Sequence, residues 1–344
     1  MKKTLTLFAL IFILILAGCS QAAPKTAQEK PAEQAASKQE AKQEPKQEAK
    51  PKTDFPKKPI EMIVPYAAGG ANDVAARILA NVASKYLPNG QNIVIVNKPG
   101  GASIVGTTEL FQAKPDGYKI GMIALATLTN RPHTGNTMFT HDSFDPVMQV
   151  FTFPQTLFVK QDASWKTFEE WLAYVKANPG KFTYGIGASG SSAHLTMESF
   201  AEAAGVQLKV VPFDGGAPAV TALMGGHIQG AVLQSTLVPE GRKLAMTGSK
   251  RSELFKDVPT LKEKGFDVGL DEISGLLAPK GTPKEVIEVL HDAFRKALND
   301  PEVIEQFRKV GAEPMYASGA DFQKTASEKF KTNGELMKKL GLTK

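Results

Sequence analysis

Cysteine is almost absent from this sequence, because Cys19 is the single one among 344 residues. The rest of the chain therefore has no thiol for a disulfide or for a cysteine-ligated metal. The 5 histidines are widely spaced and form no His-Glu-x-x-His pattern, so no zinc site is expected. Apolar runs stay shorter than the ~20 residues of a membrane-spanning helix. Aromatic residues are only 8% and lysines are scattered, which disfavours a nucleic-acid surface.

The remaining composition is that of an ordinary globular protein. Hydrophobic residues make up 42% and charged residues 22%, with 30 glycines. These values exclude a collagen, a coiled coil and a wholly disordered chain. At about 150 residues per domain the length predicts roughly two domains. The formal charge of +6 falls to +4 without Lys2 and Lys3, so it is a weak indicator of partners.

The first residues have the pattern of an export signal. Lys2 and Lys3 precede an apolar run over 7–17, which predicts a signal peptide over 1–18. The run ends in Leu16-Ala17-Gly18-Cys19, which resembles a bacterial lipobox, in which the cysteine is lipidated and becomes the first mature residue. A stray buried thiol is the alternative for Cys19. The motif predicts an extracytoplasmic protein of the cell envelope, lipid-anchored to the membrane.

A tether is expected between the lipid and the body. Residues 19–54 consist mainly of Ala, Lys, Gln, Glu and Pro, and large apolar residues are missing between 20 and 54. Such a segment cannot form a core and stays disordered. Its flexible reach would be on the order of 30 Å.

From residue 55 onward, short apolar runs alternate with amphipathic stretches. This pattern is typical of βαβ units and predicts an α/β body with a mainly parallel sheet. Strands are expected at 60–64, 93–96, 119–124, 182–184, 208–211 and 231–233. Helices are expected at 74–86, 104–111 and 192–204, around Val220, and at 286–298, with the last third of the chain helical.

The first glycine-rich turn, at 65–73, lies where a strand ends and a helix begins. Ligands bind at this place in open α/β sheets, because backbone amides and the helix dipole converge there. Glycines at 69 and 70 would let an anion approach the backbone. The alternative is that Gly69 and Gly70 only permit a tight turn, with Asn72 or Asp73 capping the helix.

The second glycine-rich turn, at 184–194, has the same placement. Gly185, Gly187 and Gly190 match G-x-G-x-x-G, and Asp214 follows at the distance of a ribose-binding acid. That match makes an exported enzyme that uses this turn, a hydrolase or an NAD-dependent dehydrogenase, the rival class, and an adhesin or structural lipoprotein is a third alternative. An exported protein meets little NAD, however, so a carboxylate cradle is preferred.

The serines of this turn support the cradle. Hydroxyls of Ser189, Ser191 and Ser192 can donate to an anion beside backbone amides. A phosphate loop is excluded because no Gly-Lys-Ser/Thr follows, and a hydrolase elbow because Ser191 stands where a glycine is required. His194, just inside the helix, would donate to a ligand or brace its own loop, and bracing is favoured.

Together these residues resemble the TctC or Bug family, the extracytoplasmic solute-binding receptors of tripartite tricarboxylate transporters, over about 57–340. The resemblance depends on the order and spacing of several blocks: Ile63–Gly70 with Asp73 and Arg77, Asn97–Gly100, Pro115–Tyr118, Gly190–Leu195, Val211–Phe213 with Gly215 and Ala217-Pro218, Gly225-Gly226, and Asp257–Leu261. Val96 and Gln229 depart from the acids usual at those places.

The resemblance implies a periplasmic-binding-protein type II architecture. One lobe would comprise 55–159 plus 273–344 and the other 160–272, with crossovers near Lys160 and Ile273. Such receptors bind a small carboxylate by closure of the lobes. They deliver it to large and small membrane subunits of a transporter driven by an ion gradient. Neither a cofactor nor a catalytic residue is implied.

The expected ligand-binding residues come from both turns and the strand ends beside them. Ser191 and Ser192 would donate to a carboxylate, Gly69 and Gly70 would supply amides, and Asp214 would gate the site or take a ligand amine. Asp73 is expected to be a cap with a water-mediated role. The full set is Tyr66, Ala68, Gly69, Gly70, Asn72, Asp73, Thr127, Ser189, Gly190, Ser191, Ser192, His194, Asp214 and Gly215.

Overall fold

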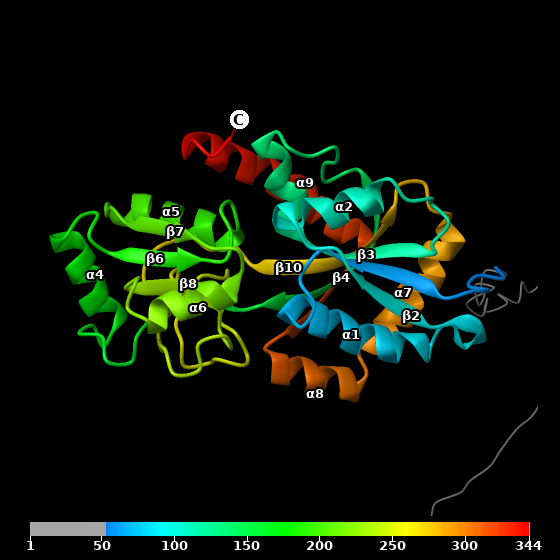
Figure 1. The fold of residues 1–344 in the computed structure, drawn as a ribbon, viewed down its shortest axis with the longest axis horizontal. Coiled ribbons are helices and arrows are strands. Elements are labelled where there is room, and N and C mark those ends of the chain that lie inside the picture. The colour runs from blue at the N-terminus through cyan, green and yellow to red at the C-terminus, as the bar shows by residue number, and fades with distance from the viewer. Residues whose placement is uncertain (1–52, 344) are drawn as a thin grey trace, which may run out of the picture. The chain divides into compact units, whose positions relative to one another are not determined.

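The computed structural model describes residues 53–343. The predicted signal peptide, Cys19 and nearly all of the predicted tether lie outside the described residues. The described chain forms two α/β lobes, each built on its own mixed sheet (Figure 1). No helix in this part of the chain is long and apolar enough to cross a membrane.

The first lobe contains the six-stranded sheet, in the order β11-β4-β10-β3-β1-β2. Strands β1, β2 and β3 are parallel, with β2 at the edge of the sheet, whereas β10 runs antiparallel to β3 and β4. The strands are β1 (Ile60–Val64), β2 (Ile93–Asn97), β3 (Lys119–Ala124), β4 (Phe144–Phe153), β10 (Glu272–Pro279) and β11 (Glu313–Ser318). The helices are α1 (Ala71–Ser84), α2 (Ile104–Phe111), α3 (Leu125–Thr129), α7 (Lys284–Leu298), α8 (Pro301–Val310) and α9 (Gly319–Lys339).

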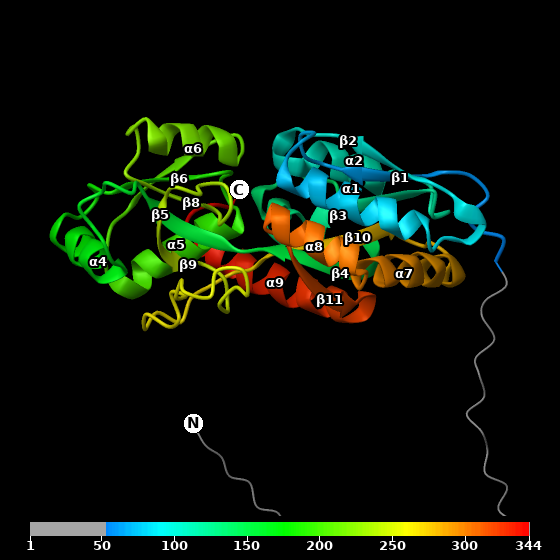
Figure 2. The ribbon, with the colours of Figure 1, turned by 90° about the horizontal axis from the view of Figure 1, so that it is seen from below.

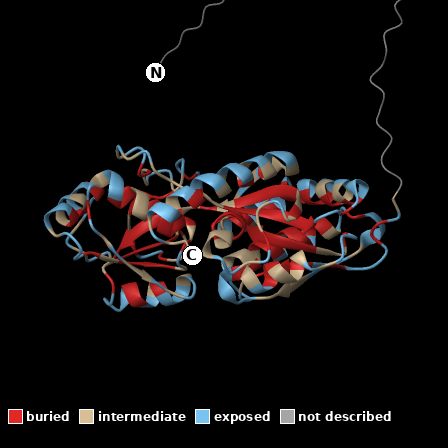
Figure 3. Ribbon diagram, turned by 90° about the horizontal axis from the view of Figure 1, so that it is seen from above, coloured by how far each residue is buried: buried red, intermediate tan, exposed pale blue. Residues whose placement is uncertain are grey.

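The helices of this lobe are amphipathic and bury their apolar stripes. In α7, Val286, Leu290 and Phe294 recur at helical spacing and are all buried, as the sequence predicts. α1 packs against both α7 and α8 (Figure 2). The buried residues concentrate on the sheets, while the outer faces of the helices are exposed (Figure 3).

The second lobe contains the five-stranded sheet, in the order β7-β6-β8-β5-β9. The strands are β5 (Gln155–Val159), β6 (Thr183–Ile186), β7 (Lys209–Pro212), β8 (Gly230–Gln234) and β9 (Arg242–Met246). The helices are α4 (Phe168–Ala177), α5 (Ser192–Ala204) and α6 (Gly216–Met224). Trp171, Phe182 and Phe200 are fully buried in its core, where Trp171 meets Phe182 edge to face and stacks on Phe200.

The chain passes between the lobes twice. Only Pro154 separates β4 in the first sheet from β5 in the second, so 155–159 belong to the second sheet rather than to the first lobe as expected. Because Pro154 is the only residue between β4 and β5, the sequence has no longer loop that would mark the change of sheet. The return is at Glu272, the first residue of β10 and one position before the expected crossover. β10 and β11 also show that the last third is not wholly helical.

The topology brings the two glycine turns to corresponding sheet edges. β1 and β3 are parallel neighbours, so the segments that follow them leave the same edge, where antiparallel β10 begins. In the second sheet, β6 and β7 end at the edge where β5 begins. Both crossovers therefore lie beside the carboxyl ends of the parallel strands, the place where α/β sheets bind ligands.

Candidate functional site

Asp73 holds the first glycine turn together. Its side chain is only 2% exposed, and Oδ2 accepts hydrogen bonds from the Gly69 amide at 2.8 Å and Arg77 Nε at 3.0 Å. Oδ1 accepts from Asn97 Nδ2 at 2.8 Å. Burial by itself would raise the pKa of Asp73, but these hydrogen bonds and the charge of Arg77 lower it below its ordinary value. Asp73 is a brace rather than a helix cap, since Gly70 is the N-cap residue and has no side chain.

The expected amide donors Gly69 and Gly70 both have partners inside the turn. The Gly69 amide donates to Asp73, and the Gly70 amide donates to the Ala67 carbonyl at 3.2 Å. The next amides along the chain, at 71–73, make no hydrogen bond to any described residue, as is usual in the first turn of a helix. These first-turn amides, and not those of the two glycines, are therefore open to an anion.

Tyr66 joins this turn to the end of β3. Its hydroxyl oxygen accepts from the Ala124 amide at 3.1 Å, and Thr127, buried in α3, lies beside it. Burial and the nearby charge of Glu272 raise the pKa of Tyr66. Asn72, also predicted for the site, accepts through Oδ1 from Ser274 Oγ of β10 at 3.2 Å. The structure thus brings the first predicted turn, α3 and β10 to one place.

The second glycine turn is braced by His194. Its Nδ1 accepts from the Gly190 amide at 3.0 Å, which places the proton of the neutral ring on Nε2. Ser191 is the N-cap of α5, and its Oγ accepts from the His194 amide at 3.3 Å. Burial and the charge of Arg131 lower the pKa of His194. As in the first turn, the glycine amide is occupied, while the amides of Ser192 and Ala193 make no hydrogen bond to any described residue.

Three hydrogen bonds connect the second turn to the first lobe and its crossover. Asn130 Nδ2 donates to the Gly190 carbonyl at 2.9 Å, and Arg131 Nη1 donates to the Ser189 carbonyl at 2.7 Å. Ser192 Oγ, only 4% exposed as a residue, donates to Glu272 Oε2 at 2.9 Å. The two predicted turns therefore come from different lobes and share neighbours.

Arg131 and Glu272 lie beside both predicted turns, and the sequence analysis did not include them among the candidate site residues. Arg131 follows α3 at the edge where β3 ends, and Glu272 begins β10 at the same edge. They lie close enough that the charge of each shifts the pKa of the other. Arg131 follows soon after the correctly predicted strand β3, so its place in the sequence could have indicated that it lies near the site. No local sequence pattern indicated Glu272, because only the crossover into β10 brings this residue to the candidate site.

Asp214 and Gly215 lie at the end of β7. The Gly215 amide donates to the Gly187 carbonyl at 2.8 Å, which joins the two neighbouring turns of the second sheet. Asp214 is exposed, and its carboxylate has no hydrogen bond or ion pair with a described residue. Neither residue contacts the Arg131–Glu272 pair through a hydrogen bond in the described chain.

The G-x-G-x-x-G match does not form a dinucleotide loop. Gly185 lies inside β6, where a Cβ atom would come within 2.6 Å of Ile228 Cδ1. The glycine is required for packing inside the strand, whereas the first glycine of a dinucleotide loop makes the turn itself. In the described chain no group of three or more His, Cys, Asp or Glu side chains could hold a metal ion.

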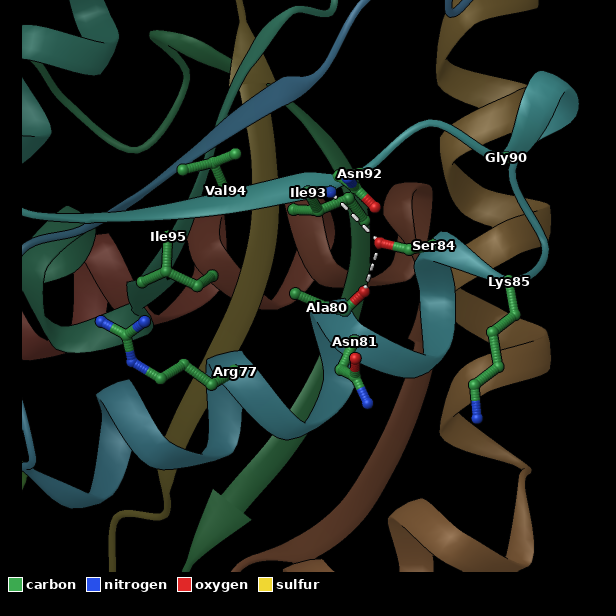
Figure 4. A pocket seen from close by; sticks show the side chains of 10 residues that line it. All are labelled: Arg77, Ala80, Asn81, Ser84, Lys85, Gly90, Asn92, Ile93, Val94 and Ile95. Carbon is green, nitrogen blue, oxygen red and sulfur yellow. Dashed lines mark hydrogen bonds between the residues drawn. The ribbon is translucent and has the colours of Figure 1, made fainter.

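The structure also has hollows away from these turns. One, of about 680 Å³, lies between α1 and the edge strand β2 and is lined by residues such as Arg77, Ser84 and Ile95 (Figure 4). Ser84 Oγ there already donates to the Ala80 carbonyl and accepts from the Ile93 amide. None of the predicted site residues lines this hollow, and it has no acidic residue or convergent set of free donors.

Known proteins are similar to most of the chain. The family described as the tripartite tricarboxylate transporter family receptor, TctC, matches residues 75–342. A UPF0065 protein of Cupriavidus necator is 37% identical over 301 residues, covering 84% of this chain and 90% of that protein. A TctC solute-binding protein from Polaromonas, solved with no ligand, is 34% identical, with a TM-score of 0.70 over 83% of this chain and 99% of that one.

A third similar structure carries a ligand. R. palustris Rpa4515, solved with adipate, is 26% identical, with a TM-score of 0.76 over 84% of this chain and 99% of that one. The structural matches confirm the predicted α/β two-lobe fold of periplasmic binding proteins.

Proposed function

The chain belongs to the tripartite tricarboxylate transporter receptor family, and we propose that it captures a small carboxylate between its two glycine turns by closure of the lobes. The family consists of extracytoplasmic solute-binding receptors, so the chain is a binding protein and not an enzyme. The rival prediction of an exported hydrolase or dehydrogenase is therefore wrong.

The placement of Arg131 carries the carboxylate proposal. Its half-buried guanidinium lies between the glycine turn before α1, in one lobe, and the glycine turn before α5, in the other. One of its N–H groups donates to the Ser189 carbonyl. Its remaining N–H groups make no hydrogen bond to a described residue, and a guanidinium fork suits a carboxylate. The open first-turn amides of α1 and α5 add donors of the same kind. The adipate bound to Rpa4515 supports this ligand class.

Lobe closure would complete the site. Donors from α1 and Arg131 belong to the first lobe, and donors from α5 belong to the second, so a ligand that contacts both sets favours the closed arrangement. Tyr66, Thr127, Ser192 and Asn72 would line the site, while Asp73 and His194 would hold the turns. Asp214 and Gly215 would act at its rim.

Delivery and attachment complete the proposal. The loaded receptor would dock on the large and small membrane subunits of its transporter. Lipid on Cys19 would hold it at the membrane, and the 19–54 segment would let the body stand away from it. More than one acyl chain is needed for stable attachment, and the lipobox modification supplies more than one.

Calorimetry with a panel of carboxylic acids tests the binding proposal. At a hundred times its dissociation constant, a ligand should stabilise the fold by about 2.7 kcal/mol, which a thermal-shift assay detects first. Arg131→Gln should weaken the best ligand roughly ten- to a hundredfold, the loss of one charge-assisted hydrogen bond or more. Arg308→Gln, on the exposed face of α8, is the matched control and should leave affinity unchanged. Absence of saturable binding across the panel, or equal affinity for Arg131→Gln, would contradict the proposal.

A further inference from the structure

A half-buried carboxylate, that of Glu272, lies inside the proposed anion site. Glu272 Oε2 accepts from Ser192 Oγ at 2.9 Å and from Gln155 Nε2 at 3.4 Å, while Oε1 has no hydrogen-bond partner among the described residues. Glu272 is near enough to Tyr66 and Arg131 to shift the pKa of each. One carboxylate oxygen therefore remains available in the middle of the site.

Two other acids near the site differ from Glu272, because both of their carboxylate oxygens accept hydrogen bonds. In Asp271, the adjacent residue, both carboxylate oxygens accept hydrogen bonds from Ser249. Oδ1 accepts from the Ser249 amide at 3.0 Å, and Oδ2 accepts from the Ser249 hydroxyl at 2.5 Å. Asp73 likewise uses both oxygens, in the first turn. These two acids have structural roles that occupy them fully, whereas Glu272 keeps an acceptor free.

A ligand made only of carboxylates does not use this acceptor. Two carboxylates that share a partly buried site repel each other, which opposes binding of a bare dianion next to Glu272. A ligand that also carries an ammonium group would donate to Oε1 and neutralise the charge of the half-buried carboxylate. Ser192 Oγ and Thr127 Oγ1 would be further acceptors for ammonium protons.

We propose that the ligand is an α-amino acid, with its carboxylate on Arg131 and the open helix amides and its ammonium on Glu272. This assignment rests on the proposed carboxylate-binding function and restricts the ligand to carboxylates that also carry an amino group. Arg131 and Glu272 supply opposite charges on the same edge of the first sheet, and the carboxylate and ammonium of an α-amino acid are opposite charges held close together. Burial raises the pKa of Glu272, while the hydrogen bond from Ser192 and the charge of Arg131 act in the opposite direction. A bound ammonium would keep the Glu272 carboxylate ionised.

Matched pairs of ligands that differ only in the amino group test the assignment. L-aspartate is compared with succinate, and L-glutamate with glutarate, by calorimetry on the wild-type protein. We expect each amino acid to bind roughly ten- to a hundredfold more tightly than its diacid partner. In Glu272→Gln this preference should be lost, because amino-acid affinity falls while diacid affinity stays equal or rises. Glu240→Gln, which removes an exposed acid elsewhere in the second lobe, should keep the wild-type preference.

The outcomes separate this inference from the function on which it rests. Diacids that bind as tightly as their amino acids, or a Glu272→Gln protein that loses both classes equally, would overturn the amino-acid assignment and leave carboxylate binding intact. A purely structural role of Glu272 predicts an unchanged preference, because glutamine can still accept from Ser192 and any residual damage to the site would weaken both classes equally. Absence of binding by any acid would instead overturn the proposed function. If Glu272→Gln does not fold, the wild-type pairs still decide.

Discussion

Ser192 Oγ donates to Glu272 Oε2 across 2.9 Å, and this bond joins the first turn of α5 to the first residue of β10. The two residues are 80 positions apart in the chain. They meet because α5 follows a parallel strand of one sheet, while β10 starts at the crossover into the other. The second glycine turn and the crossover are thus linked directly at the proposed site.

Ser192→Ala tests this link through the acidity of Glu272. The hydrogen bond from Ser192 lowers the pKa of Glu272, so its loss should raise that pKa further above the ordinary glutamate value. A carbon-13 NMR titration of the Glu272 carboxyl measures the change. Ser327→Ala removes a hydroxyl from exposed α9 and serves as the control. An unaltered Glu272 titration in Ser192→Ala would mean that the bond is not formed in solution.

Much of the fold is predictable because local signals determine it. The expected strands at 60–64 and 119–124 and the helices at 104–111 and 192–204 coincide with β1, β3, α2 and α5. Each is bounded by turn residues and has one clear periodicity. β10 and β11 were missed because their pairing partner, β4, is remote in the chain, and an apolar run alone does not distinguish a strand from a helix.

The glycine turns of the proposed site and several polar side chains beside them were predictable, but its charged side chains were not. Glycine turns after strands can be located from sequence, because the turn needs particular residues. The sequence does not show which backbone amides stay free, because this depends on side-chain contacts. Asp73 and His194 accept hydrogen bonds from the amides of Gly69 and Gly190. Glu272 reaches the site only through the crossover, so no local pattern marks it. The carboxylate of Glu272, on which the proposed ligand class depends, is therefore the part that needs the structure.

Gly69→Ala separates the role of the first turn from general stability. Gly69 has φ +78° and Gly205, which ends α5, has φ +65°, and neither has an atom near the position of an added Cβ. Both alanine substitutions should therefore cost about 1–2 kcal/mol of backbone strain. Only Gly69→Ala should also weaken carboxylate binding, because it shifts the amides at 71–73. Denaturant unfolding and calorimetry measure the two effects, and equal affinities in both variants would contradict the site.

Asp73→Asn tests the brace of the first turn. Breaking its buried hydrogen bonds should destabilise the protein by about 1–3 kcal/mol at neutral pH. The folded-state pKa of Asp73 is lowered, so its contribution is present above the ordinary aspartate pKa and is lost as pH falls through the lower folded value. Unfolding free energies of wild type and variant should therefore converge in strong acid. A difference that stays constant from neutral to acid pH would contradict an ionised brace.

Cys19→Ala tests the proposed anchor. Without the thiol the lipid cannot be attached, so the protein should move from the membrane fraction to the soluble extracytoplasmic fraction. Fractionation and mass spectrometry of the mature N-terminus measure the change. Ligand affinity of the released protein should equal that of the wild type, because the anchor precedes the body. Unchanged membrane retention of Cys19→Ala would mean that another element attaches the protein.

His194→Gln tests whether the brace of the second turn depends on a neutral ring. His194 Nδ1 accepts from the Gly190 amide, and the folded-state pKa of His194 is lowered from 6.5 by burial and by Arg131. Its contribution to stability is therefore complete above about 6.5 and declines as pH falls toward the folded value, because the unfolded chain takes the proton first. The wild type should lose at most about 1.4 kcal/mol per pH unit through this group, and His194→Gln should lack that component. Exposed His227→Gln should keep the wild-type slope, and an equal slope in His194→Gln would show that protonation does not reach the brace.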